Sequence, residues 1–408
     1  MTVRMRHSRL TFGNLVAILF RMRRLLQIVA LILAVSRSGS AQWLIQDSHT
    51  SADLRGIHSI GNGIAWASGT NGTVLRTTDD GDHWQLCATP SGAEVLDFRG
   101  IQAFDANTAI VMSSGKGDLS RLYKTTDGCL TWKLVFTNPD KNGFWDALRF
   151  SKPWPKVLSK TDGVLIGDPV AGTFSVFLSS DSGETWRRWG REGFGWKGNC
   201  GERQPKASKD EALFAASNES VVHFFSSNFL FVTGGRSGAR LVYSDLHDFD
   251  GPPCWTTFSS VRLPLARAGS SAGAFAVASK NTSYFPLRLM VVGGDYTKPD
   301  ESSGNAAFVS SKDGAHVPLS SYFTVTTPVT PPHGYRSGVA YDTPTNTWIT
   351  VGLSGTDIST DDGLNWRALR PALTEVPDAD KNWNALSLPF VVGPKGRVGK
   401  LRTAALKP

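Results

Sequence analysis

Short stretches in which apolar and polar residues alternate run through most of the chain and predict β-strands. The first group reads LRGIHSI (54–60), GIAWASG (63–69), TVLRTT (73–78) and WQLC (84–87), with Gly, Asn or Asp between the stretches. Alternation with a period of two, bounded by turn residues, is typical of half-buried strands that are joined by hairpins. We therefore expect four short antiparallel strands in this part of the chain.

This four-strand pattern recurs, which indicates a repeat protein. Further copies begin near Phe98, Phe144, Glu211, Gly273, Tyr335 and Trp383. Repeats of four short strands at this spacing are typical of the blades of a β-propeller. The last copy ends early, at Val391–Leu401, and the segment Trp43–Gln46 would supply its missing outer strand. We predict an all-β, seven-bladed β-propeller over residues 42–408, closed by strands from the two ends of this domain.

One turn recurs between the third and fourth strands of the repeats, with the pattern Ser/Thr-x-Asp-x-Gly-x-x-Trp. It reads TTDDGDHW at 77–84, SSDSGETW at 179–186 and STDDGLNW at 359–366. The copy TTDGCLTW at 125–132 has Cys129 in the glycine position, and SSKDGAHV at 310–317 has lost the aspartate and the tryptophan. Glycine tolerates a positive φ, and the aspartate can accept hydrogen bonds from unpaired backbone N–H groups. The pattern resembles the Asp-box, or bacterial neuraminidase repeat, and it predicts hairpins.

The aspartates of these turns could be catalytic or could bind calcium, or they could hold the turns together. A catalytic group is needed once in a protein, whereas a structural group is needed in every repeat, so we favour the structural role. We expect each tryptophan to pack between neighbouring sheets. The predicted structural residues are Asp79, Trp84, Asp127, Trp132, Asp181, Trp186, Asp361 and Trp366.

The basic charge of the chain lies mainly in its first 41 residues, which contain seven arginines and no acidic residue. The remaining residues hold 36 basic and 35 acidic side chains, so we expect no nucleic-acid partner. Arginines precede the apolar run Leu25–Val35, and the small residues Gly39–Ala41 follow it. This is the pattern of a secretory signal peptide over residues 1–41, with a possible start at Met22. We expect export to the periplasm or the extracellular space; an uncleaved membrane anchor that also uses Leu10–Phe20 is the alternative.

The four cysteines would then lie in an oxidising compartment, where disulfides are stable. Cys87 follows the first turn and Cys129 lies in the second, so neighbouring blades could bring them together. Cys200 and Cys254 form the complementary pair. The spacing of the cysteines and histidines does not predict a metal site, and we expect no cofactor.

Several segments resemble the photosystem II stability/assembly factor family and its non-photosynthetic bacterial relatives, which are Asp-box propellers. They include FWDAL (144–148), GDPVAGTF (167–174), VVGGDYTKPDE (291–301) and GYRSGVAY (334–341). The resemblance extends over nearly all of residues 42–408. It implies a binding scaffold or assembly factor for another exported or membrane-bound protein, and we expect the chain itself to be a monomer.

The first residues of successive repeats should form a ring at one mouth of the central channel, because the innermost strands of a propeller line that channel. Arg55, Arg99, Asp146, Glu211, Arg336 and Asn384 occupy comparable positions, and Trp145, Tyr335 and Trp383 lie beside them. These charges could neutralise one another, as interior charges usually do. Alternatively, the arginines could bind an acidic ligand or partner, since guanidinium groups pair with carboxylates through two parallel hydrogen bonds.

An enzymatic alternative uses the same residues. Sialidases share the Asp-box propeller and bind an acidic sugar with three arginines, a role that Arg55, Arg99 and Arg336 could take. Asp146 and Glu211 would then be the carboxyl pair of a glycoside hydrolase. The Arg-Ile-Pro motif of sialidases is missing near the N-terminus. A binding scaffold is therefore our principal prediction, and a sialidase-like hydrolase of acidic glycans is the alternative.

Overall fold

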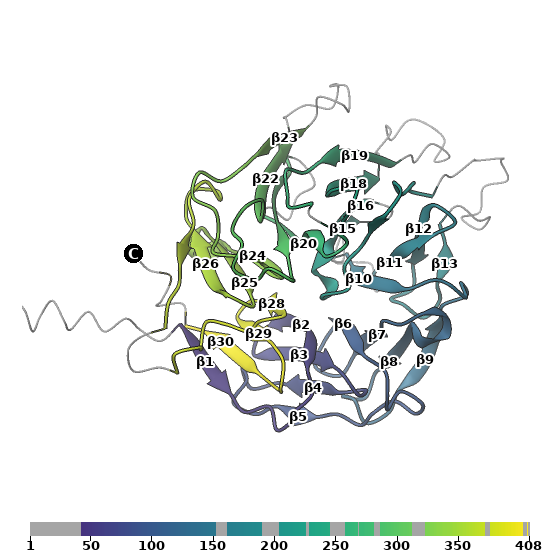
Figure 1. The fold of residues 1–408 in the computed structure, drawn as a ribbon. Helices are drawn as coiled ribbons and strands as arrows, with labels where there is room; N and C mark the ends of the chain where they lie inside the picture. The colour runs from purple at the N-terminus through teal and green to yellow at the C-terminus, as the bar shows by residue number, and fades with distance from the viewer. Residues whose placement is uncertain are drawn as a thin grey trace, which may run out of the picture. The chain divides into compact units, whose positions relative to one another are not determined.

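Seven antiparallel sheets are arranged around a common centre, so the fold is a seven-bladed β-propeller (Figure 1). The computed structural model describes residues 42–151, 161–189, 204–225, 228–244, 258–267, 269–280, 286–311, 323–371, 376–402 and 406. The predicted signal peptide, Cys200, Cys254 and most of the degenerate turn at 310–317 lie outside these residues. The described residues contain β-strands and short 3-10 turns, which confirms the predicted fold class.

Each blade consists of four strands that follow one another outward from the centre, apart from the last blade. The first three blades in chain order are β2–β5 (Leu54–Gly61, Ile64–Gly69, Val74–Thr77, Gln85–Leu86), β6–β9 (Phe98–Ala103, Ala109–Ser113, Arg121–Thr125, Lys133–Thr137) and β10–β13 (Trp145–Phe150, Gly163–Val170, Thr173–Ser179, Arg187–Arg188). The next three are β15, β16, β18 and β19 (Val221–Phe225, Asn228–Val232, Arg240–Ser244, Phe258–Arg262), then β20–β23 (Ala272–Ser279, Arg288–Asp295, Ala306–Ser311, Phe323–Thr326), and then β24–β27 (Gly338–Asp342, Thr347–Gly352, Gly355–Ser359, Arg367–Ala368). The last blade is β28–β30 (Ala385–Ser387, Phe390–Val392, Val398–Leu401) with β1 (Trp43–Gln46). We number them blades 1 to 7 in this order.

Blade 7 takes its outer strand from the beginning of the domain. β1 pairs antiparallel with β30, with Trp43 opposite Leu401 and Gln46 opposite Val398. The Trp43 indole packs against Trp383 of blade 7 at 5.9 Å and donates a hydrogen bond to Thr356 of blade 6 at 3.0 Å. The predicted closure by terminal strands is therefore present, and it joins segments that lie more than 300 residues apart in the chain.

The fourth blade departs from the sequence prediction. We expected its inner strand to begin near Glu211, but the inner strand is β15, which begins at Val221. Glu211 instead lies in the two-residue strand β14 (Glu211–Ala212), which pairs with β17 (Gly234–Gly235) and extends the sheet of blade 5. The prediction was wrong because the segment that begins at Glu211, EALFAAS (211–217), has an apolar pattern that also suits a connection between blades. Its role depends on pairing partners that are distant in the sequence.

Four turns of the repeated pattern share one hydrogen-bond network. In the first of them, the Thr77 hydroxyl donates to Asp79 at 2.9 Å and accepts the Gly81 N–H at 3.0 Å, and Asp79 accepts the His83 N–H at 3.0 Å. The turns at 125–132, 179–186 and 359–366 repeat these three contacts. Hydrogen bonds from His83 hold the pKa of Asp79 at about 2. These carboxylates are therefore ionised and engaged within their own turns.

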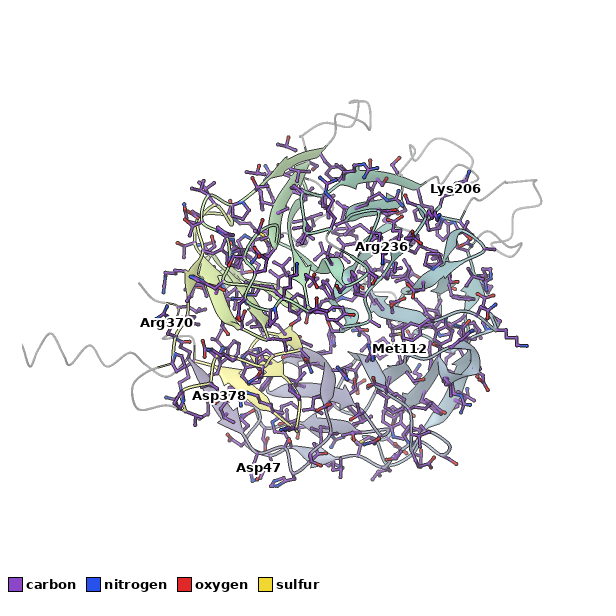
Figure 2. All side chains as sticks on the ribbon, in the orientation of Figure 1. Asp47, Met112, Lys206, Arg236, Arg370 and Asp378 are labelled. Carbon is purple, nitrogen blue, oxygen red and sulfur yellow. A yellow bond between two sulfur atoms is a disulfide. The ribbon has the colours of Figure 1, made fainter. Side chains whose placement is uncertain are left out.

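The cores lie between blades and are filled by side chains from neighbouring sheets (Figure 2). Trp84 of blade 1 contacts Phe390 of blade 7 edge to face at 5.5 Å. Trp186 of blade 3 packs in the same way on Phe150 at 5.7 Å and shares a cluster with Ile110 of blade 2. Burying aromatic side chains of this size removes roughly 150–250 Å² each from water, so the tryptophans connect one blade to the next.

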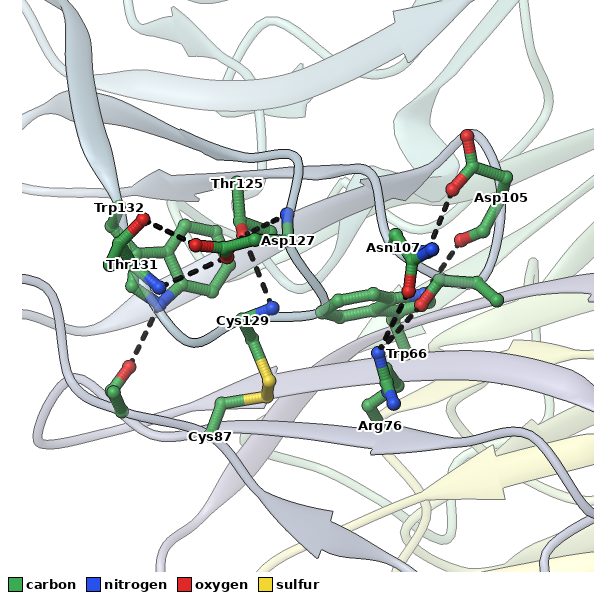
Figure 3. The surroundings of a disulfide bond; sticks show 12 residues. Trp66, Arg76, Cys87, Asp105, Asn107, Thr125, Asp127, Cys129, Thr131 and Trp132 are labelled. Carbon is green, nitrogen blue, oxygen red and sulfur yellow. Dashed lines mark hydrogen bonds between the residues drawn. A yellow bond between two sulfur atoms is a disulfide. The ribbon is translucent and has the colours of Figure 1, made fainter.

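A disulfide between Cys87 and Cys129 joins blades 1 and 2 (Figure 3). Cys87 directly follows β5, and Cys129 occupies the glycine position of the second turn with φ 69°. The turn keeps its hydrogen bonds despite this substitution, because the Cys129 N–H still donates to the Thr125 hydroxyl at 3.1 Å. Nearby, the Trp132 indole donates to the Ala88 carbonyl at 2.8 Å. Cys129 therefore has a backbone conformation that is unfavourable for a residue other than glycine. The same residue forms the covalent link between blades 1 and 2.

Removing this link should destabilise the propeller. The cysteines are 42 positions apart, and opening a loop of this size lowers the free energy of unfolding by about 2–4 kcal/mol. Urea unfolding with and without a thiol reductant measures the difference. The variant Cys87→Ser/Cys129→Ser is the control, since its stability should not respond further to the reductant. Equal stability of the oxidised protein and this variant would contradict the prediction.

Candidate functional site at the propeller axis

Three of the predicted ring residues lie at β-bulges near the start of the inner strands. The register of pairing skips Arg55 in β2, Arg99 in β6 and Asp146 in β10. A bulge turns the extra residue away from the regular alternation of the strand. These side chains therefore share a structural position in blades 1 to 3.

Arg55 and Arg99 meet at one carboxylate. The Arg99 Nε donates to Asp97 at 2.8 Å, and the Arg55 Nε lies 3.6 Å from the other oxygen of Asp97. Arg99 also donates to the Ala215 carbonyl at 3.1 Å. Both arginine side chains are 30% exposed. Two guanidinium groups share a single carboxylate, so this cluster keeps a net positive charge that solvent can reach.

Asp146 is nearly inaccessible, with 1% of its surface exposed, and it is near enough to Arg99 for the charge of Arg99 to act on it. Burial, together with the neighbouring charge of Asp168, raises its pKa well above the ordinary value, although Arg99 opposes this shift. Asp168 accepts the Leu213 N–H at 3.0 Å, and burial raises its pKa as well. The raised pKa means that the buried site disfavours the charged form of Asp146.

Glu211 is fully engaged elsewhere. Its two oxygens accept hydrogen bonds from Arg240 at 2.8 and 2.6 Å, from the Thr233 hydroxyl at 2.6 Å and from the Ser208 N–H at 2.7 Å. Burial alone would raise the pKa of Glu211, but the hydrogen bonds from Arg240 and Thr233 lower it below its usual value. This carboxylate is a structural partner of Arg240, and its burial leaves little access for a substrate.

Arg336 is also held inside the protein. Its side chain is completely buried and forms an ion pair with Asp357, which is equally buried. Further hydrogen bonds reach the Tyr335 carbonyl at 2.9 Å and the Ser354 hydroxyl at 2.8 Å. Tyr335 itself packs edge to face on Phe275 at 4.8 Å. Arg336 therefore does not join Arg55 and Arg99 in a common binding site.

The remaining predicted residues serve the contacts between blades. Trp145 is fully buried and stacks on Phe136 of blade 2 at 5.3 Å, and Trp383 is fully buried in a cluster with Ile349 and Val351 of blade 6. The Asn384 amide donates to the Leu54 carbonyl at 2.7 Å and so connects blade 7 to blade 1. Of the predicted ring, the structure thus gathers Arg55, Arg99 and Asp146 and distributes the others among separate contacts.

A short turn before the inner strand of blade 4 reaches across the axis. This turn, η2, comprises Asn218–Ser220. The Asn218 amide donates to the Ile101 carbonyl of blade 2 at 2.7 Å, and its oxygen accepts the Leu148 N–H of blade 3 at 3.2 Å. The side chain of Asn218 thereby connects blades 2 and 3 by binding one backbone group in each.

Glu219 connects two further blades. Its two carboxyl oxygens accept the Val339 N–H of blade 6 at 3.0 Å and the Leu386 N–H of blade 7 at 2.6 Å. Burial raises the pKa of Glu219 to about 8, although these hydrogen bonds and the charge of Arg149 act in the opposite direction. The acid is therefore largely protonated at neutral pH.

These contacts satisfy backbone groups that would otherwise be unpaired at the axis of the propeller. The innermost strands of blades 1–4, 6 and 7 are edge strands of their sheets, so their backbone groups on the axis side have no neighbouring strand. An unpaired buried backbone group costs about 1–3 kcal/mol. Asn218 and Glu219 satisfy such groups in four blades. We therefore call η2 (Asn218–Ser220) the hub of the propeller.

Next to the hub lies a central cavity of about 830 Å³. In blades 1 to 3, its walls come from the later residues of the inner strands, whereas Arg55, Arg99 and Asp146 lie near the starts of those strands. Ser217, Asn218 and Glu219 line the cavity as well. The arginine cluster and the cavity therefore occupy different ends of the inner strands.

Sequence reasoning missed the polar residues of this cavity. His58, Gln102, Arg149 and His223 occupy the third position in GIHSI (56–60), GIQAF (100–104), ALRFS (147–151) and VVHFF (221–225). An aligned polar position in an otherwise apolar inner strand was the available signal. No feature of the sequence indicated the role of η2, because its contacts are with blades that are distant in the sequence.

The described residues contain no group of three or more His, Cys, Asp or Glu side chains suited to a metal ion. Within the same part of the chain, no helix is long and apolar enough to cross a membrane.

No protein-family model and no curated protein matches the chain. Among solved structures, the chain is similar to "YCF48 bound to D1 peptide", with 17% sequence identity, a TM-score of 0.50, and coverage of 88% of this chain and 94% of that chain. It is also similar to YCF48 from Cyanidioschyzon merolae, with 18% identity, a TM-score of 0.54, and coverage of 89% and 100%. YCF48 is a photosystem II assembly factor, so the expected resemblance is confirmed at the level of the fold.

The raised pKa of Glu219 should make stability depend on pH. The folded protein keeps a proton on Glu219 between the ordinary value of 4.5 and about 8, while the unfolded chain has released it. The contribution of Glu219 to stability is therefore complete below about pH 4.5 and is lost as the pH rises through about 8, at no more than about 1.4 kcal/mol per pH unit.

Urea unfolding at several pH values from about 5 to about 8 tests this dependence. Glu219→Gln cannot titrate, so the free energy of unfolding of this variant should fall less steeply than that of the wild type. Glu94→Gln, at an exposed site, is the control and should follow the wild type. Parallel pH profiles for all three proteins would contradict the assignment.

Proposed function

We propose that this chain is a binding scaffold or assembly factor for another protein, and that its binding face contains the cluster Arg55, Asp97 and Arg99. The observation that carries this proposal is the partly exposed pair of guanidinium groups with only one carboxylate between them. A partner that presents acidic side chains or a terminal carboxylate would complete their pairing. The similar structure of YCF48 was determined with a D1 peptide bound, which supports a protein-binding role for this fold.

We further propose that the protein works outside the cytoplasm. The N-terminal segment 1–41 has the pattern of a signal peptide. The Cys87–Cys129 disulfide supports this proposal, because such bonds persist in oxidising compartments and are rare in the cytosol. The partner would then be another exported protein or a membrane-bound protein with an exposed segment.

The hydrolase alternative receives less support from the geometry. A glycoside hydrolase needs two carboxyl groups that flank an accessible substrate bond. Asp146 is 1% exposed, and both oxygens of Glu211 are occupied by Arg240 and Thr233 or Ser208. Arg336, the third arginine of that hypothesis, is fully buried against Asp357. We therefore propose binding, with no catalytic role for these residues.

Capture of partner proteins from envelope extracts tests the binding face. Arg55→Ala/Arg99→Ala should reduce the amount of captured partner by roughly tenfold or more, because the charge-assisted hydrogen bonds of the cluster are lost. Arg367→Ala/Arg370→Ala removes the same charge from exposed positions on blade 6 and is the matched control. Thermal unfolding should show that both variants remain folded.

The result that would overturn the proposal is equal capture of the same proteins by the wild type and both double variants. A protein retained by the wild type and the control, and lost with Arg55→Ala/Arg99→Ala, would support it. Higher salt should weaken this capture, since the contact is electrostatic and exposed.

A further inference from the structure

A group of aromatic side chains lies on the same face of the propeller as the arginine cluster. The register of β20 skips Phe275, just as the registers of β2 and β6 skip Arg55 and Arg99. Tyr296 directly follows Asp295, which pairs with the first residue of β20. Phe275 and Tyr296 therefore lie at the end of the inner strands where the two arginines also lie.

Phe275 is the centre of this aromatic group and is only 3% exposed. The Phe214 ring stacks on it at 4.0 Å, and the rings of Tyr335 and Tyr296 contact it edge to face at 4.8 and 6.1 Å. Tyr335 is buried as well, whereas Phe214 is partly exposed and Tyr296 exposes 48% of its surface. Phe275 and Tyr335 therefore support the other two rings, and a partner can reach Phe214 and Tyr296.

One short segment joins the aromatic group to the arginine cluster. The Leu213 N–H donates to Asp168 of blade 3 at 3.0 Å, and the Ala215 carbonyl accepts a hydrogen bond from Arg99 of blade 2 at 3.1 Å. Between them, Phe214 packs on the aromatic group of blade 5. Arg99 thus binds the residue that follows Phe214, and the Cα atoms of two such neighbours are about 3.8 Å apart. The accessible guanidinium groups and the accessible rings are therefore adjacent on this face.

Both accessible rings are held in place by the backbone around them. Asp295 accepts the N–H of Thr297 at 3.0 Å and its hydroxyl at 2.7 Å, which fixes the turn that carries Tyr296. Any side chain at Gly234 would collide with the Phe214 ring, so this glycine lets the ring lie against β17. Aromatic side chains supply contact area at a low cost in conformational entropy. Tyr and Arg are also enriched among the residues that dominate the affinity of protein–protein interfaces.

We propose that Phe214 and Tyr296 form a subsite for an aromatic or large aliphatic side chain of the partner protein, next to the arginine cluster that pairs with its acidic group. This inference rests on the proposed function, because it places both groups on one segment of the same partner. An extended segment advances about 3.3–3.6 Å per residue, so we expect the acidic and the apolar residue to be about two to four positions apart. The apolar side chain would cover ring surface that otherwise faces water.

Isothermal titration of the purified protein with short peptides tests this subsite. Each peptide carries one Asp and one Phe, about two to four positions apart in a glycine chain, and has blocked ends that carry no charge. Matched peptides have Ala in place of Phe, or Asn in place of Asp. The best Asp/Phe peptide should bind the wild type at least about fivefold more tightly than its Ala form, which buries less apolar surface. It should exceed its Asn form by a similar factor of about five, because the amide cannot form an ion pair with the arginines.

Variants of Tyr296 locate the apolar contact. In Tyr296→Ala, the preference for Phe over Ala should fall below about twofold, while the preference for Asp over Asn remains. Tyr296→Phe keeps the ring and should behave as the wild type does. Leu130→Ala, which removes an exposed apolar side chain from the turn between β8 and β9, is a further control and should also match the wild type. Arg55→Ala/Arg99→Ala should show the reverse pattern, with loss of the preference for Asp.

The outcomes separate this subsite from the proposed function. A preference for Asp without a preference for Phe would overturn the subsite and leave the arginine face in place. A preference for Phe that survives in Tyr296→Ala would place the apolar contact elsewhere and would overturn the subsite as well. So would the absence of any binding at about 5 mM peptide, whereas partner capture by Arg55→Ala/Arg99→Ala still decides the proposed function. Thermal unfolding checks that every variant is folded.

Discussion

The hydrogen bonds of Asn218 and Glu219 are the interaction on which the centre of this propeller depends. The side chains of neighbouring blades pack well against one another, but side-chain packing cannot satisfy the backbone groups that face the axis. Two consecutive residues of η2 reach blades 2, 3, 6 and 7 and pair with one backbone group in each. Because these groups would otherwise be unpaired, the hub holds together strands that are not neighbours.

Two different groups of side chains lie along the inner strands of blades 1 to 3. Near the starts of these strands, β-bulges present Arg55 and Arg99 around Asp97, with solvent access and a net positive charge. Further along the same strands, His58, Gln102 and Arg149 line the central cavity together with η2. The charged cluster and the cavity therefore consist of different residues and can be changed independently.

Local patterns in the sequence predicted the architecture well, whereas the site depended on long-range pairing. Strand alternation and the repeated turns are local features, so the seven blades and the closure by β1 could be predicted. The predicted ring assumed that comparable positions have comparable surroundings. In the structure, Arg336 is held by Asp357 and Glu211 by Arg240. These partners follow no repeat pattern, and the sequence alone offered no means to assign them.

The most direct test of the hub is hydrogen exchange at the backbone amides that it binds. In Glu219→Ala, the Val339 and Leu386 amides lose their acceptor, and the account predicts exchange at least about tenfold faster than in the wild type. The Leu148 amide, which is bound by Asn218, should change much less. The Val339 and Leu386 amides of the exposed control Glu94→Ala should also keep the exchange rates of the wild type. Unchanged protection of Val339 and Leu386 in Glu219→Ala would contradict the central role of this carboxyl group.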